Sequence, residues 1–269
     1  MTKFIPKNQF NTNQSHKDNS TALQAQNEQN TAPWIILCDF DGTISTEDTT
    51  DVLLESFGMD GWRELEEDWL EGRIGSRECM GSQIGMLNVS SETLYTRLAD
   101  MTIDPDFKAF NDAAAAQQVP LQIISDGLDS AIQFILARYD LAHLPIYANK
   151  LIEQENDRWS LEFPYAEADC LKASGNCKCA RAASVKITPK LTSQRILYIG
   201  DGSSDFCVSN RVDVVLAKDK LIDYCQDQGI THHAIRNFKD ALALLPEILK
   251  STPIKAAQPM MHFPTPSFN

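Results

Sequence analysis

Three short apolar runs in this sequence each end abruptly in carboxylate or hydroxyl side chains, and no other feature constrains the fold as strongly. Runs of this length and apolarity are typical of buried parallel strands, whose carboxyl ends meet along one edge of a sheet. We therefore expect the polar side chains to converge on one site. The runs are Trp34–Cys38, before Asp39-Phe40-Asp41-Gly42-Thr43; 121–124, before Ser125-Asp126-Gly127; and 195–199, before Gly200-Asp201-Gly202.

Helical patterns separate these runs from one another and from a fourth apolar run at 213–217. They cover residues 129–139, 203–211 and 240–249. Strands that alternate with helices predict a parallel sheet with helices on both faces. The expected fold class is therefore α/β, with a doubly wound, Rossmann-like parallel sheet.

Two segments interrupt this alternation. Residues 47–115 carry apolar residues at helical spacing and little strand signal, which predicts an inserted helical cap domain. Residues 146–165 hold two strand-like pieces around a polar turn, which predicts a small β-hairpin. The α/β core is then expected at 34–46 and 116–250, a disordered tail at 1–33, and a loose proline-containing tail at 251–269.

Composition narrows the possible partners. The net charge is -13 and no run is rich in Lys or Arg, so nucleic acid and anionic membranes are not expected partners. No apolar run is long enough to span a bilayer, and the N-terminus lacks the apolar segment of a signal peptide. The seven cysteines then predict reduced thiols and a cytoplasmic location. These features leave the oligomeric state open.

Asp39 and Asp41 lie close together after the first predicted strand, so both carboxylates can face one site. A carboxylate nucleophile divides the hydrolysis of a phosphomonoester into two transfers through an aspartyl phosphate. A second carboxyl group can protonate the leaving oxygen and later deprotonate water. Because these carboxylates and the substrate are all negative, a hard cation such as Mg²⁺ is expected between them.

Other residues at the predicted strand ends suit the same reaction. Asp201 and Asp205 supply further carboxylates, and Ser125 can donate a hydrogen bond to phosphate. Lys178 can neutralise the developing charge of a phosphoryl group. Each residue alone has a structural alternative, since Asp and Gly are ordinary turn residues and a single lysine is most often solvated. Their occurrence together, in this order, favours phosphoryl transfer.

On these motifs the sequence resembles the haloacid dehalogenase superfamily, in its phosphoserine-phosphatase-like branch with a helical cap. The resemblance covers Trp34 to about Leu249 and implies that Asp39 is the nucleophile and Asp41 the acid/base. It also implies the ligands of Mg²⁺ and of the phosphoryl group. Mg²⁺ would be held by the Asp39 side chain, the Asp41 carbonyl and Asp201, with Asp205 binding through water or orienting Asp201; the phosphoryl group would be bound by Ser125, the Gly127 amide and Lys178, for which Lys172 and Lys186 are neighbouring alternatives.

Within this branch the sequence most resembles the phosphatases of methionine salvage that act on 2-hydroxy-3-keto-5-methylthiopentenyl-1-phosphate. The shared features are Asp48 after the first motif, Arg77-Glu78-Cys79 in the cap and cysteines before Lys178. Phosphoserine and phosphocholine or phosphoethanolamine are alternative substrates. A non-catalytic, phosphate-binding regulatory module is a further alternative.

Two smaller questions stay open from the sequence. Asp48 stands where phosphoserine phosphatases place a glutamate that meets the substrate's amino group, but it also suits the N-cap of a cap helix. Cys170, Cys177 and Cys179 lie near one another in the sequence, and three thiols could bind zinc. Because no fourth ligand is evident, we expect reduced thiols there.

Overall fold

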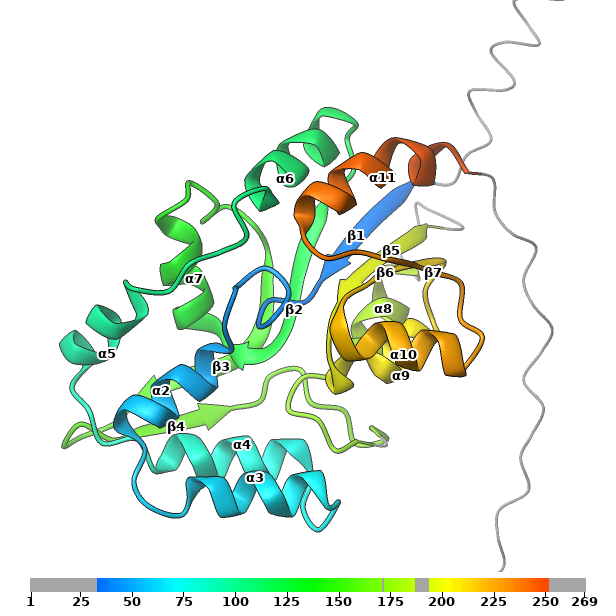
Figure 1. Cartoon of the computed structure of the whole chain (residues 1–269). Helices are drawn as coiled ribbons and strands as arrows, with labels where there is room; N and C mark the ends of the chain where they lie inside the picture. Colours follow the sequence, from blue (N-terminus) through cyan, green and yellow to red (C-terminus); the bar gives the residue numbers. More distant parts are fainter. Residues whose placement is uncertain (1–32, 171, 187–193, 252–269) are drawn as a thin grey trace, which may run out of the picture. The chain divides into compact units, whose positions relative to one another are not determined.

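A seven-stranded sheet organises the computed structural model, which describes residues 33–170, 172–186 and 194–251 (Figure 1). The predicted tails at 1–33 and 251–269 lie outside the described residues, apart from Pro33 and Ser251. The strands, in spatial order, are β4 (Trp159–Glu162), β3 (Ile146–Glu153), β2 (Leu121–Leu128), β1 (Trp34–Cys38), β5 (Arg195–Gly200), β6 (Val214–Ala217) and β7 (His232–Ala234).

All neighbouring strands are parallel except β3 and β4, which form the predicted antiparallel hairpin. From β1 the chain builds outward through β2 and β3, and then returns to build β5, β6 and β7 on the other side. The direction of winding therefore reverses between β1 and β5, where open α/β sheets bind their ligands beyond the carboxyl ends of the strands. The predicted doubly wound α/β sheet is confirmed.

Alternate residues of β1 point to opposite faces of the sheet, and each face has its own cover. Ile36 and Cys38 belong to a large apolar core with residues of α6, α7 and α11, whereas Ile35 and Leu37 pack with α8 and α9. The covering helices are α6 (Phe107–Ala116), α7 (Asp129–Ala137), α8 (Lys178–Lys186), α9 (Phe206–Ser209), α10 (Asp219–Asp227) and α11 (Phe238–Lys250), with a short 3₁₀ turn, η1 (Ser203–Asp205).

The segment between β1 and β2 is helical, as expected, and contains α2 (Thr49–Phe57), α3 (Trp62–Leu70), α4 (Ser76–Gly85) and α5 (Ser91–Leu98) before α6. Helices α3 and α4 pack together, and α4 lies against β4 (Figure 1). In contrast, α6 packs on α11 through ring contacts of Phe107 and Phe110 with Phe238. Helix α6 thus covers the sheet, although it falls in the range predicted for the cap. The division into core and cap stays a prediction.

Element boundaries differ from the sequence prediction in a few places. Strand β2 continues to Leu128 with an irregular register after Ile124, so Ser125 and Gly127 lie in a distorted strand and not beyond its end. The helix predicted at 203–211 is shorter, divided between η1 and α9. Helix α10 and strand β7 were not predicted. Strand β7 was missed because it is a short edge strand whose sequence, HHA, carries no apolar run.

Candidate active site

The loop after β1 carries Asp39 and Asp41 to the carboxyl edge of the sheet. The Asp39 amide donates to the Ile199 carbonyl at 2.9 Å, which extends the β1–β5 pairing to the predicted nucleophile. The chain then turns tightly, and the amides of Thr43, Ile44 and Ser45 all donate to the Phe40 carbonyl. Gly42 has φ +70°, and a Cβ there would lie 2.6 Å from Asp201 Oδ2. Glycine therefore lets this turn approach the β5 loop closely.

Lys178, at the first turn of α8, reaches this loop from a distant part of the chain. Its side chain is buried, and Nζ lies 2.8 Å from Asp39 Oδ2 and 2.7 Å from Asp205 Oδ1. It also donates to Ser204 Oγ at 2.8 Å. Burial would lower the pKa of Lys178, but the carboxylates of Asp205 and Asp39 raise it well above its usual value. The alternative Lys172 is exposed, so among these two lysines only Lys178 joins the site.

Asp41 lies beside the irregular part of β2. Its Oδ1 accepts from the Thr49 amide at 2.7 Å, and its Oδ2 accepts from Ser125 Oγ at 3.2 Å. A Cβ at Gly127 would lie 2.3 Å from Asp41 Oδ2, so the close approach requires glycine. Burial, with a smaller contribution from the nearby Asp48 carboxylate, raises the pKa of Asp41 to about 7. A carboxyl group with that pKa can donate and accept a proton near neutral pH.

Asp205 is fully buried, and hydrogen bonds already use its carboxylate. Oδ1 accepts from Lys178 Nζ and, at 2.5 Å, from the Tyr198 hydroxyl. Oδ2 accepts from the amides of Asp201 at 2.9 Å and Gly202 at 3.0 Å. Burial opposes ionisation, but Lys178 holds the pKa of Asp205 below its usual value. This arrangement favours the orienting role for Asp205 over direct contact with a metal.

Asp39, Asp201 and Asp205 each offer an oxygen within 4.8 Å of the others. Burial and then Asp205 raise the pKa of Asp39 well above its usual value, and the same two causes raise the pKa of Asp201 to about 6. The single positive charge of Lys178 therefore does not compensate the negative charge of the three carboxylates. Because the donors are all carboxylate oxygens, the group suits a hard divalent cation. The Asp41 side chain is not part of this group.

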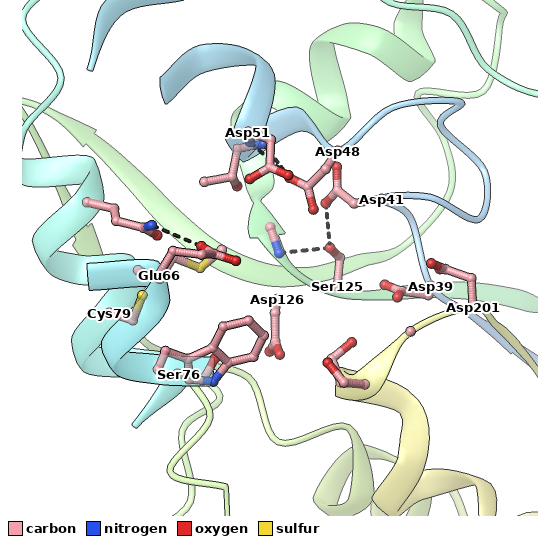
Figure 2. Close-up of a pocket in the computed structure, with 18 residues that line it drawn as sticks. Asp39, Asp41, Asp48, Asp51, Glu66, Ser76, Cys79, Ser125, Asp126 and Asp201 are labelled. Carbon is pink, nitrogen blue, oxygen red and sulfur yellow. Dashed lines mark hydrogen bonds between the residues drawn. The ribbon is translucent and has the colours of Figure 1, made fainter. Parts of the chain in front are cut away.

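One pocket of about 210 Å³ is lined by Asp39, Asp41, Ser125, Gly127 and Asp201 together with residues from α2, α3 and α4 (Figure 2). Lys178 and Asp205 are buried and are not among its lining residues. Figure 2 shows Asp39 and Asp201 on one side and Glu66, Ser76 and Cys79 on the other. Asp48 lines the pocket and is also the N-cap of α2, where its Oδ1 accepts from the amides of Thr50 and Asp51. Besides Asp39, Asp41 and Asp201, the acidic residues that line the pocket are Asp48, Asp51, Glu66 and Asp126.

Sequence reasoning missed Lys218, which follows β6. Its Nζ donates to the carbonyls of Gly42 at 2.8 Å and Thr43 at 3.2 Å, so it ties the Asp39–Asp41 loop to the next strand end. Thr43 in turn donates to Asp201 Oδ1 at 2.5 Å. The available signal was a lysine directly after the fourth apolar run, at the same edge of the sheet as the acidic residues.

The fold is the one found in haloacid-dehalogenase-type hydrolases, and the family match identifies the protein as a phosphatase, a phosphoric monoester hydrolase. The chain belongs to the phosphatase family described as "Putative Phosphatase", which matches residues 34–221. The chain is 29% identical over 213 residues to the 2-hydroxy-3-keto-5-methylthiopentenyl-1-phosphate phosphatase of Exiguobacterium sp. (strain AT1b), covering 78% of this chain and 96% of that protein.

Two solved structures share the fold. A haloacid dehalogenase family hydrolase from Salmonella enterica serovar Typhi matches with a TM-score of 0.62 and 20% identity, over 83% of this chain and 77% of that one. A phospho-aspartyl intermediate analogue of phosphoserine phosphatase matches with a TM-score of 0.61 and 15% identity, over 79% and 99%. Separately, no helix among the described residues is long and apolar enough to cross a bilayer.

Proposed function

We propose that this protein hydrolyses a small phosphomonoester in a Mg²⁺-dependent reaction, with Asp39 as the nucleophile. The observation that supports this most directly is the placement of the Asp39 carboxylate. The Asp39 carboxylate lies directly after β1, in contact with the Lys178 ammonium. Two residues further along the loop is Asp41, whose carboxyl group has a raised pKa. A phosphate-binding module without catalysis would not need this second carboxyl group.

In the first step, an Asp39 carboxylate oxygen attacks phosphorus and the ester P–O bond breaks. The Asp41 carboxyl group gives its proton to the leaving oxygen. In the second step, Asp41 takes a proton from water, whose oxygen attacks phosphorus, and the bond to Asp39 breaks with release of phosphate. In this proposal Ser125 Oγ, the Gly127 amide and Lys178 Nζ bind the oxygens of the phosphoryl group. What supports it is that Ser125 Oγ contacts Asp41, the Gly127 amide donates to Ser125 Oγ, and Lys178 Nζ contacts Asp39.

Mg²⁺ would be held by the Asp39 and Asp201 side chains, whose oxygens lie within 4.8 Å of each other, and, in this proposal, by the Asp41 carbonyl. Asp205 accepts from the Asp201 amide and would hold the Asp201 loop in place. When bound, the ion would neutralise charge between the carboxylates and the phosphoryl oxygens. The Thr43 hydroxyl donates to Asp201 Oδ1, and Lys218 Nζ donates to the Gly42 carbonyl in the same loop as Thr43. Together these contacts would keep Asp201 in position for this role.

For the substrate, we propose 2-hydroxy-3-keto-5-methylthiopentenyl-1-phosphate in methionine salvage. Relatives with this name match almost their whole length. Trp69 and Met80, on α3 and α4, line the pocket and offer apolar surface to a methylthio group. Because this substrate is a small metabolite, the proposal includes a cytoplasmic location for the protein.

A phosphorylated amino alcohol, such as phosphoethanolamine or phosphocholine, is the second candidate. Asp48, Asp51 and Glu66 line the part of the pocket formed by α2 and α3, and no Lys or Arg is among its lining residues in the described chain. Such a surface favours a cationic head group. It disfavours phosphoserine, because the substrate carboxylate would meet acidic side chains without a cation to pair with.

The test compares kcat/KM for the methylthiopentenyl phosphate, phosphoethanolamine, phosphocholine and phosphoserine, in wild type and in Asp48→Ala. The first substrate should be best in wild type and little affected by Asp48→Ala. If an amino alcohol phosphate is best and loses most in Asp48→Ala, the second candidate is correct. Phosphoserine as the best substrate would contradict both. Release of p-nitrophenol from p-nitrophenyl phosphate, with and without Mg²⁺, separates an enzyme from a non-catalytic module.

A further inference from the structure

Four of the seven cysteines line one pocket outside the active site. Cys170 and Cys177 come from the segment that leads into α8, Cys179 from the first turn of α8, and Cys207 from α9. Cys177 and Cys179 are buried in the apolar cluster beneath the sheet, and Cys170 and Cys207 pack against that cluster while half-buried. The structure thus supplies a fourth sulfur that the local sequence could not reveal.

The four sulfurs form two pairs. Cys170 lies next to Cys177, and Cys179 next to Cys207, close enough for the thiols of each pair to act on one another's pKa. All four are free thiols. In a tetrahedral thiolate site, metal–sulfur bonds of about 2.3 Å place the sulfurs about 4 Å apart. Each pair can therefore supply two neighbouring ligands of such a tetrahedron.

A gap separates the two pairs of sulfurs. Among the described residues, the carboxylates of Asp39, Asp201 and Asp205 are the only group of three or more ligand atoms within 4.8 Å of one another. A metal would have to bring the two pairs together. Cys170 and Cys207 are the half-buried members, so rotation of their side chains is the movement that can close this gap.

The surroundings suit a metal held by four thiolates. Such a site with Zn²⁺ carries a net charge of about -2, and both Lys172 and Arg211 line the same pocket. Thiolate sulfur is a soft ligand that selects zinc over magnesium. In a chain of reduced cysteines, convergence of thiols is more typical of metal binding than of a disulfide framework.

We propose that Cys170, Cys177, Cys179 and Cys207 bind one structural zinc ion that fixes the active-site lysine. Lys178 lies between two of these ligands, and Asp205, its buried partner, stands two residues before the fourth on the chain. Zinc would join the start of α8 to α9 and so hold Lys178 Nζ against Asp205 and Asp39. The ion takes no part in the reaction, and this inference does not depend on which phosphomonoester is the substrate.

Metal content tests the proposal independently of activity. Full-length protein is purified without added metal or an affinity tag that binds metal, and its zinc is measured by mass spectrometry. About one zinc per chain is expected, with the ultraviolet thiolate charge-transfer bands and intense visible bands of tetrahedral Co²⁺ after exchange. Cys207→Ser and Cys177→Ser should lose the metal, whereas Cys79→Ser, on α4 away from this pocket, should keep it.

A protein that stays metal-free after incubation with Zn²⁺, or Cys207→Ser with full zinc, would overturn the proposal. A Cys179–Cys207 disulfide found by mass spectrometry in metal-free protein, purified without reductant, would do the same. If the serine variants fail to fold, wild type decides the matter. A zinc-selective chelator that leaves Mg²⁺ in place should then release one zinc and lower the melting temperature.

Discussion

The Nζ atom of Lys178 lies 2.8 Å from Oδ2 of Asp39, so the first residue of α8 is paired with the residue that follows β1. Both side chains are almost completely buried. A buried ammonium next to the proposed nucleophile can hold that carboxylate in place and compensate charge as a phosphoryl group approaches. Because Asp205 contacts the same ammonium, three distant segments of the chain meet at one atom.

Asp39→Asn should abolish turnover, since an amide cannot form the aspartyl phosphate. We expect kcat to fall at least about a thousandfold. The fold should persist, because Lys178 keeps its pairing with Asp205. Single-turnover release of phosphate and circular dichroism are the measurements, and Asp51→Asn at the pocket wall is the matched control. Near-normal kcat in folded Asp39→Asn protein would exclude this mechanism.

The pH profile should report Asp41. As the proton donor it must be protonated, so kcat/KM should fall as pH rises above about 7, the pKa to which burial and Asp48 raise it. Asp48→Asn keeps an effective N-cap on α2 but removes a negative charge. Asp41 should then ionise more easily, and the alkaline fall should move to lower pH. The pH profiles of both proteins are compared with one substrate at saturating Mg²⁺, so that the ionisation of the substrate affects both equally. If the alkaline fall in kcat/KM does not move, or moves to higher pH, Asp41 is not the proton donor.

Metal dependence should distinguish Asp201 from Asp205. Chelation should stop turnover, and Mg²⁺ should restore it. Asp201→Asn removes a proposed ligand, so the half-saturating Mg²⁺ concentration should rise at least about tenfold. Asp205→Asn instead leaves the buried Lys178 paired with Asp39 alone, whose raised pKa disfavours its charged form, whereas Asp205 has a lowered pKa. We therefore expect a loss of about 3–5 kcal/mol in the free energy of unfolding. Urea unfolding and Mg²⁺ titration of both variants decide this, and equal behaviour would refute the division of roles.

Lys218→Met should loosen the loop that carries Asp39 and Asp41, because it removes the donors to the Gly42 and Thr43 carbonyls. A displaced nucleophile can cost as much as about a hundredfold in rate, so we expect kcat to fall by about tenfold or more with a smaller change in KM. Lys218→Arg should recover most of kcat. Lys220→Met, at an exposed neighbouring lysine, is the control. If Lys218→Met behaves like this control, Lys218 has no positioning role.

Local patterns predicted much of the fold. The apolar runs at β1, β5 and β6 were found because buried parallel strands need continuous apolar sequence, and the hairpin was found from its polar turn. Strand β7 and the bulge in β2 were not found. An edge strand has little apolar burial to mark it, and the bulge depends on how Gly127 fits against Asp41, which is distant in the sequence.

The sequence by itself determined where Asp39, Asp41 and Asp201 lie, because strand ends in a parallel sheet share one edge whatever the details of packing. Only the tertiary structure decided what their partners are. It brought Lys178, and not the exposed Lys172, into contact with Asp205. The Asp205 carboxylate accepts hydrogen bonds from Lys178, Tyr198 and backbone amides. Cys207 lies beside Cys179. These outcomes depend on contacts between distant segments and on burial, which set side-chain pairing and pKa and have no local signature in the chain.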